Sequence, residues 1–157
     1  MVKNFCYLGV LISDDCKHDN AIDKERKLLY ARGNKLIRLF SHCSKDVKIK
    51  LFRTYCTSFY CASLWSNFSS NSFKRIKVAH NTIFKVLMKA DGYSSASRLF
   101  VEYNVPNTDV ITRKLSCSLY NRILHSDNNM VKVIVDSLYF NTSLLYKHWL
   151  EQLFFLK

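Results

Sequence analysis

Residues 22–40, IDKERKLLYARGNKLIRLF, carry the clearest helical pattern in the sequence. Leu29, Gly33, Leu36 and Phe40 recur at spacings of four, three and four residues, the period of one helix face. A second face carries the basic residues Lys24, Lys27, Lys35 and Arg38. The two stripes predict an amphipathic helix, ending near residue 41, that packs by one side and presents cations on the other. Gly33 would allow a neighbouring helix to approach closely.

Two more long helices are predicted downstream. Ser44 is a candidate N-cap for a second helix over 45–64, whose apolar residues cover two sides, as in a helix central to a core. A third helix is predicted over 73–90, where Asp91 and Gly92 end it. Its outward stripe carries Lys74, Lys77, Asn81, Lys85 and Lys89, of which Lys74, Lys77 and Lys85 are candidates for contact with nucleic acid. Shorter helices are predicted at about 95–103, 107–125, 128–139 and 141–155.

The composition supports a helical fold. Only 3 Gly and 1 Pro occur in 157 residues, which disfavours a turn-rich β-sandwich and a glycine-dependent dinucleotide fold. The segment FCYLGVLI at 5–12 is rich in β-branched and aromatic residues and predicts a strand or half of a hairpin. We therefore expect a mostly α fold: a helical bundle with a three-helix core plus C-terminal helices, and a short N-terminal β-strand or hairpin. Its parts would be a strand and loop at 1–16, a basic helical bundle at 17–92 and a C-terminal helical segment at 93–157.

The positive charge is concentrated in one part of the chain. The formal net charge is +12, and residues 1–90 hold 17 Lys and Arg against 6 Asp and Glu. Residues 91–157 hold 7 against 6, and no acidic residue occurs between Thr54 and Ala90. A charge excess confined to one region indicates a face that binds a polyanion, since ordinary surface charge is mixed in sign.

No combination of residues predicts a catalytic centre. Asp14 and Asp15 follow the predicted strand and resemble half of a two-metal site, but such a site needs a third carboxylate from an upstream strand. A polar loop is the simpler interpretation. The five histidines lack metal-ligand spacing, and three glycines are too few for a phosphate-binding loop. We expect no catalytic residue, no metal site and no cofactor.

Cysteine usage and hydropathy bear on the compartment. The six cysteines form no C-x-x-C pair and lie mostly among apolar neighbours, which indicates free thiols in a reducing compartment. No apolar run reaches the roughly 18–20 residues of a membrane span, and no secretory signal opens the chain. The expectation is an intracellular protein, nuclear or cytoplasmic, without a membrane partner.

Tyrosines accompany the basic stripes. Tyr7, Tyr30, Tyr55 and Tyr60 could stack on bases, as aromatic side chains do in proteins that bind single strands. For Tyr55 and Tyr60, which fall on the apolar stripes of the predicted second helix, the favoured interpretation is that they belong to the core.

Several segments resemble, in order, the C-terminal part of a non-LTR (LINE-type) retrotransposon reverse transcriptase. FCYLGVLIS at 5–13, followed by a polar loop and a basic helix, resembles the aromatic-Leu-Gly primer-grip strand and the start of the thumb in that family. KIKLFRTYCTSFYCASLW at 48–65 resembles the thumb helix, and FKRIKVAHNTIFKVL at 73–87 resembles the next helix. SRLFVEYNVP at 97–106 and the stretch 113–128 resemble the segment downstream of the thumb.

This resemblance implies a nucleic-acid-binding fragment. The catalytic aspartates of the family lie upstream of the aromatic-Leu-Gly strand, so this chain would have no polymerase activity of its own. Tyr7, Leu8 and Gly9 would approach the primer, and the basic residues of the first helix would face an RNA/DNA template–primer duplex without sequence preference. We expect the remnant of a degenerate element copy, or a gene whose start has been misjudged.

A helical protein-interaction module is the alternative, such as a domesticated retroelement remnant. The strand at 5–12, separated from its palm neighbours, would expose an apolar edge to a protein partner. Reversing the charges of the first helix distinguishes the two functions, because it should abolish nucleic-acid binding and leave an apolar interface intact.

Overall fold

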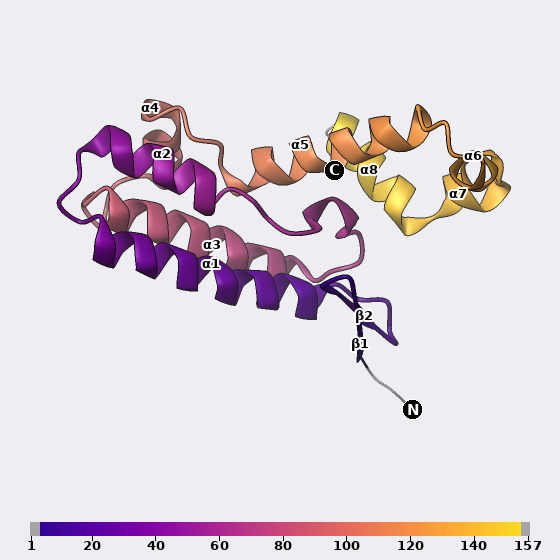
Figure 1. The fold of residues 1–157 in the computed structure, drawn as a ribbon, viewed down its shortest axis with the longest axis horizontal. Helices are drawn as coiled ribbons and strands as arrows, with labels where there is room; N and C mark the ends of the chain where they lie inside the picture. The colour runs from indigo at the N-terminus through magenta and orange to yellow at the C-terminus, as the bar shows by residue number, and fades with distance from the viewer. Residues whose placement is uncertain (1–3, 155–157) are drawn as a thin grey trace.

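The computed structural model describes residues 4–154, and two parallel helices form its centre (Figure 1). Helix α1 spans Asp19–Leu39 and helix α3 spans Ser70–Leu87. Their N-terminal ends meet where Asp19 Oδ1 accepts hydrogen bonds from the Ser69 backbone N–H at 3.1 Å and from the Ser69 hydroxyl at 2.6 Å. Further along, Gly33 of α1 lies against Ile83 of α3, which confirms the close approach expected at this glycine. These contacts fix how the two helices lie against each other.

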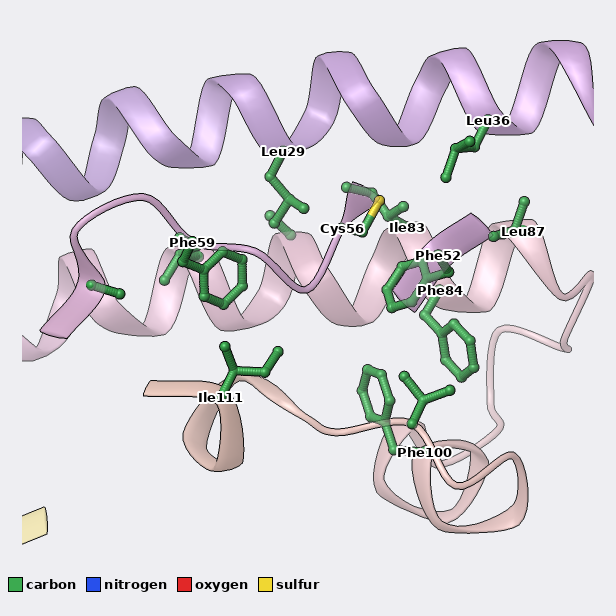
Figure 2. Close-up of a cluster of buried hydrophobic side chains, with 14 of the residues drawn as sticks. Leu29, Leu36, Phe52, Cys56, Phe59, Ile83, Phe84, Leu87, Phe100 and Ile111 are labelled. Carbon is green, nitrogen blue, oxygen red and sulfur yellow. The ribbon is translucent and has the colours of Figure 1, made fainter. Parts of the chain in front are cut away.

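The core lies between α1, α3 and the elements that cover them (Figure 2). Helix α2, Lys45–Tyr55, contributes Phe52, whose ring lies 4.7 Å from that of Phe84 on α3. His80 of α3 is fully buried, and its ring stacks on Phe100 with 5.2 Å between centroids. Neither ring nitrogen of His80 has a hydrogen-bond partner among the described residues, and burial lowers its pKa to about 4. The imidazole is therefore neutral in the folded protein near pH 7.

The prediction that the second helix continues to residue 64 is wrong. Helix α2 ends at Tyr55, and the chain then crosses the core as a loop before a single 3₁₀ turn, η1, at Ala62–Leu64. Cys61 adopts a left-handed backbone with φ of 54°, which is incompatible with a continuous α-helix. The loop and turn bury one apolar residue in every three: Cys56, Phe59, Ala62 and Trp65. A spacing of three residues resembles the apolar stripe of a helix, which is why the sequence predicts a continuous helix up to residue 64.

The N-terminal segment is a β-hairpin. Strands β1, Asn4–Tyr7, and β2, Val10–Ser13, pair antiparallel with Phe5 opposite Ile12. Leu8 and Gly9 form the two-residue turn with φ of 48° and 82°. Positive φ at both turn residues is the backbone that matches the twist of a tight hairpin. The strand expected at 5–12 thus supplies its own partner, and no third strand joins the sheet within residues 4–154.

The C-terminal helices begin at the core, to which the first two contribute Phe100 and Ile111, and then extend beyond it (Figure 1). They are α4, Ala96–Glu102; α5, Thr108–Leu124; α6, Asn129–Asp136; α7, Leu138–Thr142; and α8, Leu144–Phe154. The predictions of single helices over 128–139 and over 141–155 need correction, because Ser137 and Ser143 are extended and bound a separate short helix, α7. The indole N–H of Trp149 on α8 donates to the Ser63 carbonyl at 3.1 Å and joins this segment to η1. The structure confirms the predicted class, mostly helical with a short N-terminal hairpin.

The third helix begins and ends three residues earlier than predicted. Ser69 accepts a hydrogen bond from the Ser72 N–H and so caps α3 at its N-terminal end. At the other end Lys89 takes a left-handed conformation with φ of 53°, and the helix stops at Leu87. The inward positions Ile76, His80 and Ile83 are all buried.

Candidate nucleic-acid interface

The outward face of α1 carries exposed cations. Lys35 and Arg38 lie on it and border a shallow groove, which is also lined by Ala31, Asn34 and Leu39. The opposite face of the helix is buried through Leu29, Gly33 and Leu36, as the sequence period predicts. Within residues 4–154 neither Lys35 nor Arg38 forms an ion pair. These two charges are therefore available to an external anion.

Asp23, a residue of α1, forms ion pairs with three cations, one of which lies on α3. Asp23 lies 2.8 Å from Arg26, 3.1 Å from Lys27 and 3.2 Å from Arg75 of α3. Hydrogen bonds from Arg26 and then Lys27 lower the pKa of Asp23. The side chain of Lys27 remains 73% exposed, so it can still contact an external phosphate if its ion pair with Asp23 breaks. Sequence reasoning singled out neither Asp23 nor Arg75.

Lys24 supports the hairpin instead of pointing freely into solvent. Its Nζ donates to the Gly9 carbonyl at 3.1 Å, and the Tyr60 hydroxyl donates to the Leu8 carbonyl. The Tyr60 ring also lies against Gly9, where an added Cβ would be 3.2 Å from Tyr60 Cε1. Two side chains from separate segments thus hold both carbonyls of the turn. The left-handed backbone at Leu8 costs energy, and these hydrogen bonds offset part of it.

Of the three hairpin residues that the resemblance placed near a primer, two have open side chains. Tyr7 is 59% exposed and Leu8 is 75% exposed. Phe5 and Ile12, which pair across the strands, are exposed as well. Gly9 faces Tyr60, so its role here is to let the turn pack.

The basic stripe of α3 is only partly free. Lys74 is exposed and forms no ion pair within residues 4–154. Lys77 pairs with Asp109 of α5 at 2.7 Å, and its ammonium lies 5.8 Å from the centre of the Phe73 ring. Lys85 donates to the Gly92 carbonyl at 3.1 Å. Lys77 and Lys85 therefore stabilise the fold, whereas Lys74 and Lys89 are exposed and form no ion pair within residues 4–154.

The expectation that Tyr55 and Tyr60 belong to the core is wrong. Tyr55 is 50% exposed and Tyr60 is 56% exposed. Tyr30 is half-buried, with the Arg26 guanidinium carbon 6.0 Å from its ring centre. Tyr55 lies at the end of α2, where the chain leaves the helix and turns into the loop.

A buried ion pair beneath α1 was not anticipated. Glu25 is almost fully buried and pairs with Arg32, which also donates to the Ser58 carbonyl at 3.2 Å. Burial raises the pKa of Glu25, and the nearby Arg32 guanidinium opposes that rise. Arg32 thereby satisfies both an acid of α1 and a carbonyl of the loop after α2. The pair is structural and leaves no charge for a ligand.

The acidic pair at the start of the chain lies in a loop. Asp14 and Asp15 are exposed, and Asp15 accepts from the Lys17 backbone N–H, which lowers its pKa. Among residues 4–154 no three His, Cys, Asp or Glu side chains are grouped so that they could hold a metal ion. None of the helices in that range combines the length and the hydropathy that crossing a bilayer requires.

The chain was compared with models of protein families, with curated proteins and with solved structures, and none of them matches it.

Proposed function

We propose that the outward face of α1 binds the phosphate backbone of a nucleic-acid duplex, such as an RNA/DNA template–primer, without reading its sequence. The observation that carries the proposal is the pair Lys35 and Arg38, exposed on one helix face without a counter-ion within residues 4–154. Lysine and arginine neutralise phosphates and release condensed counterions, which gives affinity without base recognition.

The distribution of acidic side chains supports the same conclusion. Between residues 20 and 90 the acidic residues are Asp23, Glu25 and Asp46. Glu25 is buried against Arg32, and Asp23 is surrounded by three cations. Little negative charge therefore opposes an approaching phosphate. Lys27 and Lys74 are the next candidates for contact, since both are exposed.

The resemblance to a non-LTR retrotransposon reverse transcriptase indicates which duplex this face of α1 would bind. The chain would act as the thumb and the downstream part of an RNA-directed DNA polymerase of the retrotransposon type, without the catalytic palm. The hairpin lies beside the N-terminal end of α1 (Figure 1), where Lys24 donates to the Gly9 carbonyl, whereas Lys35 and Arg38 lie toward the C-terminal end of the helix. Primer extension by this chain alone should yield no product, and nucleotide incorporation would contradict the proposal.

A salt series on an RNA–DNA hybrid tests the proposal. We expect binding whose logarithmic salt slope corresponds to about 3–5 phosphates. The Lys35→Glu/Arg38→Glu variant should weaken binding and reduce that slope by about 2. The matched control is Lys114→Glu/Arg122→Glu, which makes the same change of charge at exposed positions on α5. Equal losses in both variants would show a response to net charge alone and would overturn the assignment to α1.

A protein-interaction module is the second candidate, favoured by the exposed apolar side chains of the hairpin. A protein partner should bind the wild type and the Lys35→Glu/Arg38→Glu variant with equal Kd. It should lose affinity for a Phe5→Ser/Ile12→Ser variant, because both residues lie exposed on one face of the hairpin. If the partner instead lost affinity for the Lys35→Glu/Arg38→Glu variant and bound the Phe5→Ser/Ile12→Ser variant like the wild type, the hairpin would not be the protein-binding surface.

A further inference from the structure

A small cavity lies beneath the hairpin. It has a volume of about 200 Å³, opens to solvent, and is lined by β2, by the first turns of α1 and by the segment that leads into η1. Leu11 and Leu28 form part of its apolar wall, and Cys61 lines it from the loop. The hairpin and the loop after α2 thus meet around one cavity, although they are about fifty residues apart in the chain.

A second thiol lies on the hairpin face that adjoins this cavity. Cys6 of β1 is the cross-strand partner of Leu11 of β2. Directly paired residues of an antiparallel ladder project to the same face of the sheet. Leu11 lines the cavity together with Cys61, so Cys6 lies on the hairpin face that is turned toward the region of Cys61.

Tyr60 connects the two segments that carry these thiols. Its hydroxyl donates to the Leu8 carbonyl, two residues after Cys6, and its own neighbour in the chain is Cys61. The Cys61 thiol, by a side-chain hydrogen bond, and then the Cys6 thiol, by its charge, both raise the pKa of the Tyr60 hydroxyl. Effects of this kind weaken with distance, so both thiols lie in the neighbourhood of this hydroxyl group.

We propose that Cys6 and Cys61 form an oxidation-sensitive pair that hydrogen peroxide converts into a disulfide between the hairpin and the loop after α2. Peroxide first oxidises one thiolate to a sulfenic acid and is itself reduced to water. The second thiol then attacks that sulfur, forms the S–S bond and releases a second water. Cys6 is exposed and Cys61 is half-buried, so peroxide can reach them. All the cysteines are free thiols in the structure.

Neighbouring cysteines provide natural comparisons. Cys56 is fully buried and burial raises its pKa to about 11, which suppresses the reactive thiolate. Cys16 is as exposed as Cys6 but belongs to the loop before α1. The proposal therefore requires a specific pairing, and not merely the oxidation of whichever thiol is exposed.

Mass spectrometry of the oxidised full chain tests the pairing. The protein is treated with peroxide, its remaining thiols are alkylated, and it is digested with trypsin. We expect the peptide 4–17 linked to the peptide 54–74, with two thiols lost per chain. Each peptide contains two cysteines, so fragment-ion sequencing of the linked pair must assign the bond to Cys6 and Cys61. This measurement on the unsubstituted protein does not depend on the folding of any variant.

Single substitutions check the assignment. Cys6→Ser and Cys61→Ser should each abolish the linked peptide, whereas Cys16→Ser and Cys56→Ala should retain it. A bond assigned to Cys16 or Cys56 would overturn the proposal. So would oxidation that proceeds at Cys43 or Cys117 while Cys6 and Cys61 stay reduced.

Discussion

Gly33 of α1 and Ile83 of α3 lie so close that a Cβ added at Gly33 would be 2.5 Å from Ile83 Cγ2. Alanine at this position would gain about 1 kcal/mol of helix propensity, but the contact would force the helices apart at a cost of about 1–3 kcal/mol. We therefore expect Gly33→Ala to lower the free energy of unfolding by up to about 2 kcal/mol. Urea unfolding followed by circular dichroism measures the change.

Two further variants separate the contact from general effects of a glycine replacement. Ile83→Ala in the Gly33→Ala background should show a favourable coupling free energy, because the clash is removed. Gly92→Ala should be almost neutral, since a Cβ at Gly92 would meet nothing within 4 Å. A Gly33→Ala protein as stable as the wild type, with no coupling to position 83, would disprove the close packing of α1 on α3.

The same contact shows how much of the fold the sequence could predict. The period of Leu29, Gly33 and Leu36 identified α1 and its buried face, because a helix must bury its apolar stripe whatever lies opposite. The same reasoning failed after Tyr55. There the buried residues recur every third position in a chain that is not an α-helix, and periodicity alone cannot separate the two cases.

The candidate site was predictable only in part. The outward position of Lys35 and Arg38 follows from the helical period. That Lys24 is bound to Gly9, and Lys77 to Asp109, depends on contacts between segments distant in the chain. No pattern within one segment carries such information. A stripe of like residues in the sequence therefore overstates the number of cations that are free to bind a ligand.

Removing the hydroxyl of Tyr60 should loosen the hairpin. Tyr60→Phe loses the hydrogen bond to the Leu8 carbonyl, which is worth about 1 kcal/mol, so hairpin amides should exchange with solvent about fivefold faster. Hydrogen exchange followed by mass spectrometry of peptides covering 4–13 measures this. Tyr55→Phe is the matched control, because Tyr55 is equally exposed. Unchanged exchange in Tyr60→Phe would mean that the hydrogen bond does not hold the turn.

Acid should destabilise the fold through His80. Burial lowers the pKa of His80 to about 4 in the folded state, against about 6.5 in the unfolded chain. The unfolded state therefore binds the proton first as the pH falls. The stabilisation is present above pH 6.5 and is lost between about pH 6.5 and 4, with a slope of at most roughly 1.4 kcal/mol per pH unit.

A substitution isolates this contribution from those of the carboxylates. His80→Phe keeps an aromatic ring among Phe52, Phe59 and Phe100 and removes the titrating group. Its unfolding free energy should fall less steeply than that of the wild type over this pH range. His42→Phe, at an exposed position, should keep the wild-type slope. Identical slopes for His80→Phe and the wild type would show that His80 titrates normally in the folded protein.

Neutralising Asp23 should strengthen nucleic-acid binding while it weakens the fold. Asp23→Asn frees Lys27, Arg26 and Arg75 from their shared partner and removes a negative charge from the proposed face. We expect affinity for an RNA–DNA hybrid to rise about threefold at low salt, and stability to fall by up to about 1 kcal/mol. The control Asp127→Asn removes an exposed charge from the near-neutral C-terminal segment and should change neither quantity. Tighter binding in both variants would point to net charge, and weaker binding in Asp23→Asn would contradict the proposed face.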